Sequence, residues 1–191
     1  MKLMLPLLLV AFYLMPAINS NPPQSKKKTE QPAKVEDGKY PAPPDNVSRL
    51  FYVQRDPNAN TVIYDLNLDK TGRPDAENPV HIYWIKYADK GQKDELNYIQ
   101  RKFAYGLSTK KVSEEQFDVR FVSYKKLALT LKKGEDNKFH IFVNADQKQI
   151  ALNRIFVKVE GGSFWLPNIV YVELKGIDPT SGKEVVSRFK P

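Results

Sequence analysis

Cysteine is absent from this chain of 191 residues, which excludes a disulfide framework, a thiolate nucleophile and any metal site built on thiolates. Its absence also excludes a lipid anchor on a cysteine behind an export signal. Histidine is almost as scarce, since the chain has only two, His81 and His140. Neither belongs to a nucleophile elbow or a zinc-binding pattern. The sequence therefore predicts no metal, no cofactor and no recognisable catalytic constellation, and it leaves enzymatic activity undecided.

Long hydrophobic runs are also lacking, apart from one at residues 3–15, which reads LMLPLLLVAFYLM. This run is too short to span a bilayer comfortably, and the small residues behind it offer cleavage after Ala17 or Ser20. We expect residues 1–20 to be a secretory signal peptide, with an uncleaved N-terminal anchor as the alternative. No second run follows, so we expect no integral membrane span after cleavage. Export without cysteine is typical of a bacterial envelope, and we expect a secreted or periplasmic location.

Negative charge is in deficit, because 22 acidic residues face 30 basic ones and the formal net charge is +8. One interpretation is a set of solvated loop lysines, and the other is an anionic partner such as lipid headgroups or an acidic glycan. Export argues against nucleic acid as that partner. The basic doublets are Arg101-Lys102, Lys110-Lys111, Lys125-Lys126 and Lys132-Lys133.

Composition divides the chain after the signal into two parts. Residues 21–45 contain six prolines, three consecutive lysines and one aromatic residue. Such a segment cannot bury enough apolar surface to offset the entropy cost of ordering, so we expect a disordered tether. The remainder, residues 46–191, has the length of one domain.

The stretch 79–106 joins the most apolar strand candidate to the best helix candidate. Apolar residues occupy both faces of residues 80–87, so this strand is expected to be covered on both sides. The following residues have helical periodicity, which predicts a short amphipathic helix. In this prediction Asp94 is the N-cap, Gly106 is a left-handed C-cap, Leu96, Ile99, Phe103 and Leu107 face inward, and Tyr98, Arg101, Lys102 and Tyr105 form a rim.

Short segments rich in β-branched and aromatic residues fill most of the domain and are separated by turn signals. In addition to 80–87, they are 49–55, 60–68, 116–124, 126–132, 138–144, 148–160, 168–176 and 183–189. The apolar phase shifts within 148–160, which predicts a bulge near Asn153 and Arg154. About nine strands and one short helix favour an all-β antiparallel meander, closed into a barrel or a curved half-barrel. A β-sandwich is the alternative.

Four segments of the sequence together carry a resemblance to a known family: LFYVQR, NPVHIYWIKY, ELNYIQRKFAYG and RIFVKVEGGSFWLPNIVYVELKGIDP. Together they resemble the DUF4833 family, an uncharacterised domain found in exported proteins of Gram-negative bacteria. The resemblance covers most of residues 49–190. It agrees with the export signal, and it implies no activity, ligand or catalytic residue.

Three hypotheses for the function of the protein are compatible with the sequence. The first is a non-enzymatic envelope module that binds an apolar, anionic or saccharide ligand or a protein partner. The second is a hydrolase or lyase that uses an unpatterned histidine and carboxylate, and the third is a structural or assembly component of the envelope. A calcium loop beginning at Asp65 is rejected, because Lys70 stands where glycine is needed and Ala76 where a bidentate acid is needed. The candidate binding residues are His81, Tyr83, Tyr87, Tyr98, Arg101, Tyr105, His140, Arg154 and Trp165. For Arg101 the alternative is an internal ion pair with Asp94, Glu95 or Asp118.

Overall fold

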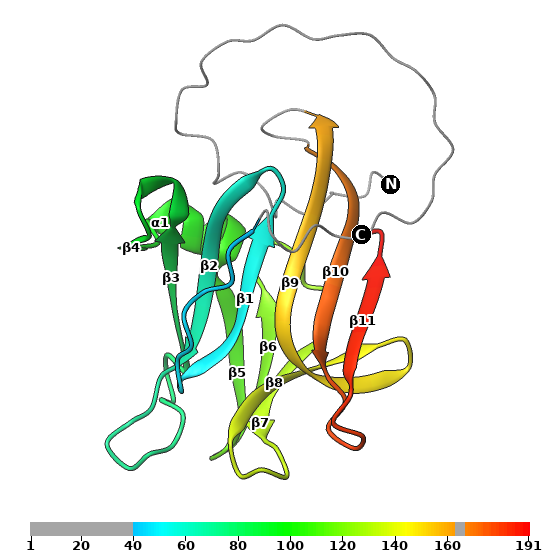
Figure 1. Ribbon diagram of the computed structural model, residues 1–191. Helices are drawn as coiled ribbons and strands as arrows, with labels where there is room; N and C mark the ends of the chain where they lie inside the picture. The colour runs from blue at the N-terminus through cyan, green and yellow to red at the C-terminus, as the bar shows by residue number, and fades with distance from the viewer. Residues whose placement is uncertain (1–39, 163–166) are drawn as a thin grey trace, which may run out of the picture.

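The computed structural model describes residues 40–162 and 167–191, most of which lie in one curled sheet (Figure 1). Its main path runs β4-β3-β2-β1-β9-β8-β7-β6-β5, and β10 and β11 extend from β9. The fold is an all-β curved half-barrel with one short helical segment, as the sequence predicts. The strands are β1 (Arg49–Arg55), β2 (Asn58–Leu66), β3 (Val80–Lys86), β4 (Gln92–Glu95), β5 (Leu107–Ser113), β6 (Gln116–Phe121), β7 (Leu129–Lys133), β8 (Phe139–Ala145), β9 (Lys148–Gly162), β10 (Pro167–Ile177) and β11 (Glu184–Phe189).

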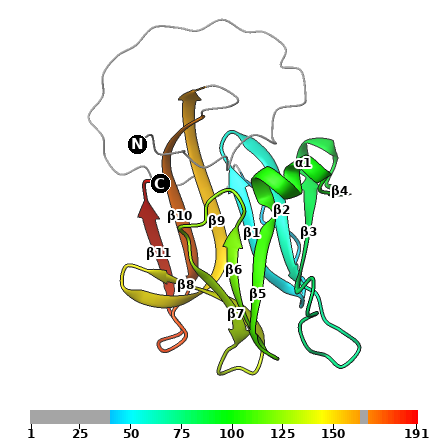
Figure 2. The ribbon, with the colours of Figure 1, turned by 180° about the vertical axis from the view of Figure 1, so that it is seen from behind.

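The long strand β9 produces the curl. Its first residues pair with β8, whereas Arg154 to Val157 pair with β1 on the same side. The β1–β9 pairing is parallel and departs from the antiparallel meander. On its other side β9 pairs with β10, and the register skips Asn153. The predicted bulge near Asn153 and Arg154 is therefore confirmed. The bend there places β5–β7 across the half-barrel from β1–β3, and they lie in front of β1–β3 in Figure 2.

The concave face of the sheet is filled by aromatic side chains. Phe51 and Tyr64 stack with their ring centroids 4.3 Å apart. Phe121, from the opposite side of the half-barrel, meets both rings edge-on at 6.2 and 5.8 Å. Such contacts add to the hydrophobic stabilisation that burial of these rings provides. The interior is thus a packed core at this level, which disfavours an apolar ligand bound inside the half-barrel.

The helical segment lies between β4 and β5 at one end of the half-barrel and consists of α1 (Tyr98–Gln100) and the π-helical turn η3 (Arg101–Tyr105) (Figure 1). Its N-cap is Asn97 rather than Asp94, because Asn97 and Gln100 form a capping box. Gly106 is extended, with φ −63°, and is not a left-handed cap. Glycine is needed there because a Cβ would lie 1.9 Å from the Arg101 carbonyl oxygen.

The predicted inward face of this segment is only partly correct. Leu96 is buried, but Ile99 and Phe103 are 59% and 39% exposed. Ala104 and Tyr105 enter the core instead, so the predicted rim position of Tyr105 is wrong. The cause is the π turn, whose wider hydrogen-bonded loop changes the helical phase assumed in the prediction.

Residues 40–48 run along the outer, convex side of β1 and β2. The Tyr40 ring lies 5.1 Å from that of Phe156, and its hydroxyl donates to the carboxylate of Asp56. The Gln54 side chain donates to the Pro41 carbonyl at 2.9 Å. Residues 40–45, which the sequence assigns to the tether, therefore begin the described structure packed on the sheet. The predicted signal peptide and residues 21–39 lie outside the described residues.

Within residues 40–162 and 167–191, no helix combines the length and hydropathy needed to cross a membrane.

Candidate functional site

Strand β3 positions the polar side chains of the candidate site. Ile82 and Trp84 point into the main core, whereas Tyr83 and Ile85 belong to a smaller cluster on the outer face. Because side chains alternate along a strand, His81 shares the outer face with Tyr83. The register of β2 and β3 places Asp65 directly beside His81. A polar group of residues thus forms where the outer face meets the loop between these strands.

Asp65 is the structural centre of this group. Its carboxylate accepts hydrogen bonds from Asn46 Nδ2 and Arg49 Nε, both at 2.7 Å, and from the Tyr83 hydroxyl at 2.9 Å. The side chains of Arg49 and Asp65 are 14% and 9% exposed. Burial, and next the Asp65 carboxylate, raise the pKa of Tyr83 above its ordinary value. This saturated cluster holds residues 46–49 against the sheet.

Glu95 of β4 joins His81 to Arg101. Its Oε1 lies 2.8 Å from His81 Nε2, and its Oε2 accepts from Arg101 Nη2 at 2.5 Å. Arg101 Nε also donates to the Leu96 carbonyl at 3.2 Å. All three side chains are about half exposed, at 49% for His81, 59% for Glu95 and 45% for Arg101. The geometry places an imidazole and a guanidinium on one carboxylate, within reach of solvent.

His81 and Arg101 line a shallow cleft of about 410 Å³. Most of its lining groups are amides, hydroxyls or charged groups, which suits a ligand that both donates and accepts hydrogen bonds. The lining residues are Asn46, Ser48, Asp65, Leu66, Asn67, Asn78, Val80, His81 and Arg101. We refer to it as the His81 cleft.

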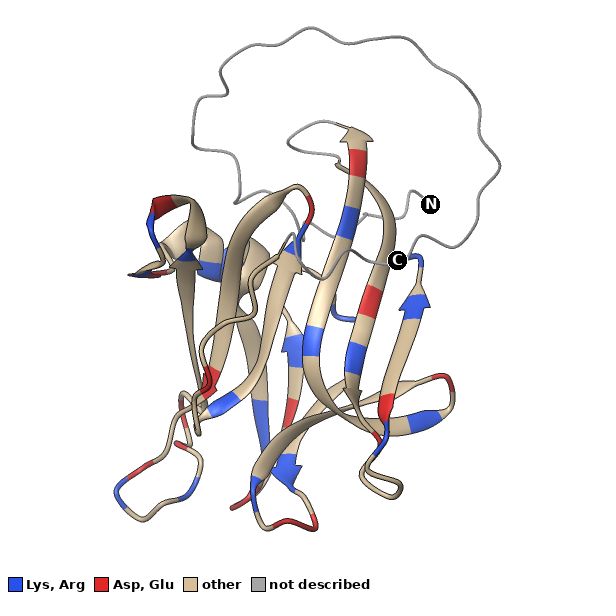
Figure 3. Cartoon of the chain, in the orientation of Figure 1, with Lys and Arg blue, Asp and Glu red and all other residues tan. Residues whose placement is uncertain are grey.

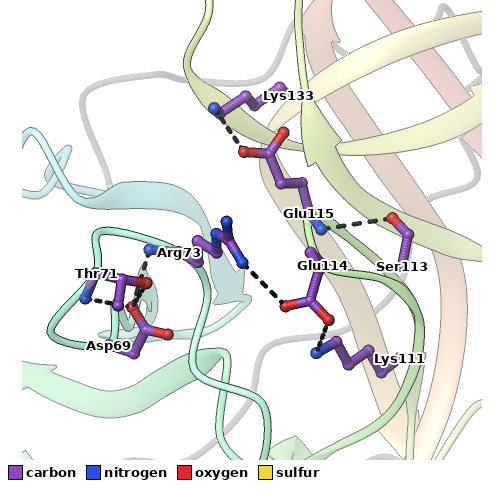
Figure 4. Close-up of polar contacts among 8 residues, drawn as sticks. All are labelled: Asp69, Thr71, Arg73, Lys111, Ser113, Glu114, Glu115 and Lys133. Carbon is purple, nitrogen blue, oxygen red and sulfur yellow. Dashed lines mark hydrogen bonds and ion pairs between the residues drawn. The ribbon is translucent and has the colours of Figure 1, made fainter.

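The loop of residues 67–79, which borders the cleft, is held by its own polar contacts. Asn67 Nδ2 donates to the Asn78 carbonyl at 2.9 Å. Asp69 Oδ1 accepts from the backbone and hydroxyl of Thr71, both at 2.7 Å. The bond from the Thr71 hydroxyl is the largest cause that lowers the Asp69 pKa, followed by the bond from the Arg73 backbone N–H. Arg73 reaches Glu114 in the β5–β6 turn at 3.4 Å (Figure 4). The acids of the rejected calcium pattern thus serve as local hydrogen-bond acceptors.

A second cleft, of about 600 Å³, lies on the other side of residues 42–48 and shares Asn46 with the first. Three cationic residues line it, but each has a carboxylate near it: Asp65 for Arg49, Glu173 for Arg154 at 4.0 Å, and Glu184 for Lys175 at 3.0 Å. Figure 3 shows the same mixture of signs along β9, β10 and β11. The cleft is therefore close to electrically balanced.

Arg154, which lines this second cleft, is buried and makes contacts that support the sheet. It is 5% exposed, and its Nε donates to Gln54 Oε1 at 2.8 Å. Its guanidinium lies 5.0 Å above the centroid of the Phe156 ring. Glu173 completes the network, because it also accepts from Arg188 Nε at 2.8 Å. These contacts join strands β1, β9, β10 and β11 across the outer face.

The other sequence-predicted candidates are dispersed. Tyr87 packs on the outer-face cluster, Tyr98 is 70% exposed on α1, and Tyr105 is buried in the core. His140 pairs with Asp136 at 3.0 Å beside the β7–β8 turn. Burial alone would raise the Asp136 pKa, but hydrogen bonds from Lys138 and His140 hold it below its ordinary value. Trp165 lies outside the described residues.

The structure thus brings together His81, Tyr83 and Arg101 and adds three residues that the candidate list omitted, namely Glu95, Asp65 and Asn46. Glu95 is one of the three acids predicted as alternative internal partners of Arg101, and the structure shows this ion pair. Asn46 had none, because its place depends on the tertiary path of residues 40–48. No group of three or more acidic or histidine side chains able to hold a metal occurs in the described part of the chain.

Comparisons with known proteins return no curated protein and no solved structure that matches this chain. One family model does match, that of the domain of unknown function DUF4833, over residues 51–188. The match covers well over half of the chain and includes both β2 and β3, which form the floor of the His81 cleft. The chain therefore belongs to the DUF4833 family.

Proposed function

We propose that this protein is an exported binding module for an acidic saccharide, bound in the His81 cleft. The observation that carries the proposal is that the Glu95 carboxylate contacts both His81 and Arg101 at the edge of a cleft lined by amides. A planar guanidinium recognises a carboxylate in two-point geometry, and amide and imidazole groups match sugar hydroxyls. The apolar run at residues 3–15 supports export to a bacterial envelope.

The choice of a polar ligand over an apolar one rests on the core. Phe51, Tyr64 and Phe121 fill the concave side, whereas the His81 cleft on the convex side is polar. The choice of the His81 cleft over the larger one rests on exposure. Arg101 is 45% exposed, whereas Arg154 is buried among partners.

Calorimetry with oligomers of a uronic acid, and with neutral oligomers of the matching hexose, tests the proposal. We expect preferential binding of the acidic oligomers, and Arg101→Gln should weaken it at least tenfold, since hydrogen bonds to charged groups contribute about 1.5–3 kcal/mol. Arg73→Gln is the matched control, because Arg73 is a similarly exposed arginine paired with a glutamate. Equal binding by the two variants, or no preference for the acidic oligomers, would refute the proposal.

Acid–base catalysis in the same cleft is a second candidate, supported by the 2.8 Å contact between His81 and Glu95. A carboxylate that orients an imidazole is the usual arrangement of a general base. With a uronate bound at Arg101, His81 would take the proton next to the carboxylate. The electrons of that C–H bond would form a C=C bond, and the adjacent C–O bond would break, its electron pair leaving with the oxygen, which takes a proton from water.

This elimination produces an unsaturated uronate that absorbs in the ultraviolet, so it can be followed directly. Wild type and His140→Ala should generate product, and His81→Ala should not. His140 is the matched control because it too is paired with a carboxylate, at 3.0 Å from Asp136. Binding without product from wild type would leave the module non-enzymatic, and product from His81→Ala would exclude this base.

A further inference from the structure

Exposed apolar side chains gather on the helical segment. Among the described residues, three of the seven exposed large hydrophobic side chains lie within six positions of each other: Tyr98 at 70%, Ile99 at 59% and Phe103 at 39%. Ile99 and Phe103 are four positions apart, a spacing that places two side chains next to each other on a helix, and Tyr98 precedes Ile99 directly. The other four, Val47, Leu68, Val112 and Val186, come from separate elements.

The orientation of this surface is fixed from the opposite side of the segment. Leu96, Ala104 and Tyr105 are anchored in the core, and Trp84 Nε1 donates to Gln100 Oε1 at 3.3 Å. The segment cannot rotate Ile99 and Phe103 inward without withdrawing these anchors. The three side chains therefore remain at the surface in the folded protein.

Positive charge accompanies the apolar side chains. Lys102 Nζ lies 5.2 Å from the centroid of the Tyr98 ring and 5.4 Å from that of Phe103, and it donates to the Tyr98 hydroxyl at 2.8 Å. Within the helical segment, residues 98–105, Arg101 and Lys102 are basic and no residue is acidic, and Arg101 pairs with Glu95 of β4. The outward side of the helical segment is thus both apolar and cationic.

We infer that Tyr98, Ile99, Lys102 and Phe103 form a docking surface for an anionic lipid bilayer. Aromatic and aliphatic side chains flanked by lysine suit the boundary between headgroups and acyl chains, where the charge meets acidic headgroups and the apolar groups enter beneath them. Four side chains cannot supply the roughly 800 Å² per partner that a stable protein interface requires. A shallow insertion needs far less area and gives weak, reversible binding.

Docking in this way would also set the orientation of the neighbouring site. Arg101 belongs to the same helical segment and lines the His81 cleft. A domain held through α1 and η3 would therefore keep this cleft beside the membrane surface. The inference does not depend on the proposed ligand, since it rests on side chains outside the lining of the cleft.

Flotation of the full chain with vesicles tests the inference, using phosphatidylcholine alone and an equal mixture with phosphatidylglycerol. We expect binding to the anionic vesicles, reduced at least tenfold by the double substitution Ile99→Ser and Phe103→Ser, because two apolar side chains then no longer insert. Lys102→Gln should reduce it roughly fivefold on anionic vesicles only. Every variant retains the N-terminal lysines and the apolar run, so the differences between variants report on the helical segment.

Val186→Ser and Lys138→Gln are the matched controls, because they remove an exposed valine on β11 and an exposed lysine beside β8. Both should float like wild type, and thermal unfolding should show all variants folded. Equal flotation of the double variant and wild type would overturn the inference, as would equal losses in the controls. So would a dimer in sedimentation that the double variant abolishes, since a second copy would then occupy the surface.

Discussion

The hydroxyl of Tyr64 donates a hydrogen bond to the backbone carbonyl of Tyr105 at 2.9 Å, inside the core. This contact joins β2 to the last residue of η3, and complete burial raises the pKa of Tyr64 well above its ordinary value. We expect Tyr64→Phe to lower the free energy of unfolding by about 1–3 kcal/mol, because a buried acceptor loses its donor. Urea titration measures it. Tyr98→Phe, at an exposed position, should change the same quantity by less than about 0.5 kcal/mol.

Trp84 is expected to be a major core residue. It is 4% exposed, and its ring centroid lies 5.1 Å from that of Tyr105 in an edge-to-face contact. Trp84→Ala should lower the free energy of unfolding by about 3–5 kcal/mol, through lost transfer energy and the cavity left behind. Circular dichroism in urea is the suitable measurement. A loss below about 1 kcal/mol would show that the indole does not support the core.

Asp65 and Arg49 should be strongly coupled. Removing the carboxylate by Asp65→Ala leaves Arg49 largely buried without this partner, a change that costs about 3–5 kcal/mol in buried pairs. Adding Arg49→Met should recover part of that loss, because the unpaired charge is then gone. A double-mutant cycle in urea measures the coupling, and strict additivity of the two substitutions would contradict it.

Stability should fall in alkaline solution through Tyr40 and Lys158. Burial, and next the hydrogen bond to Asp56, raise the Tyr40 pKa above 10.0, and the hydrogen bond to Asp56 raises the Lys158 pKa above 10.5. A group whose pKa is higher in the folded state contributes stability below its unfolded pKa and loses it as pH rises. Unfolding free energy should therefore decline above about pH 10.

The comparison with Tyr40→Phe isolates this contribution. Phenylalanine lacks the hydroxyl that donates to Asp56, so the variant should be less stable than wild type at neutral pH. Because phenylalanine cannot ionise, the difference in unfolding free energy between the two proteins should narrow above about pH 10. A difference in unfolding free energy that widens as pH rises would contradict the raised pKa of Tyr40.

Limited proteolysis should locate the start of the stable domain at Tyr40. The contacts of Tyr40, Pro41 and Ala42 with the sheet predict that trypsin leaves a core beginning at Tyr40 and spares Arg49 and Arg55. Mass spectrometry of the product measures its N-terminus. Tyr40→Ala should allow cleavage farther along the chain, and the same product from both proteins would show that Tyr40 does not hold the segment.

Much of the sheet could be predicted because its central strands carry local patterns. Residues 49–55 and 80–87 combine β-branched and aromatic residues, and both form strands with nearly the predicted bounds. β4 and β5 were missed, since all four residues of Gln92–Glu95 are exposed and β5 is mostly exposed and contains two lysines. Edge strands of this kind lack an apolar face, so hydrophobic alternation cannot reveal them.

The site could be predicted less well because it depends on register and tertiary path. His81 was found from its residue type and Arg101 from its position on the predicted helix. Their common partner Glu95 is placed by its pairing with Tyr83 across β3 and β4. The helical phase failed for a related reason. A π turn adds a residue to the hydrogen-bonded loop, and the three-and-four spacing of Leu96, Ile99 and Phe103 gives no sign of it.

The parallel pairing of β1 with β9 has a consequence for biogenesis. Gln54 and Arg154 hydrogen-bond across this pairing and are 100 residues apart. One edge of β1 therefore stays uncovered until the last third of the chain has been synthesised. Contacts so distant in sequence form slowly. During synthesis the N-terminus emerges first, so the chain passes through a stage in which the open edge of β1 can pair with another molecule. Truncation before residue 154 would make that stage permanent, and aggregation rather than a smaller folded domain is the expected product.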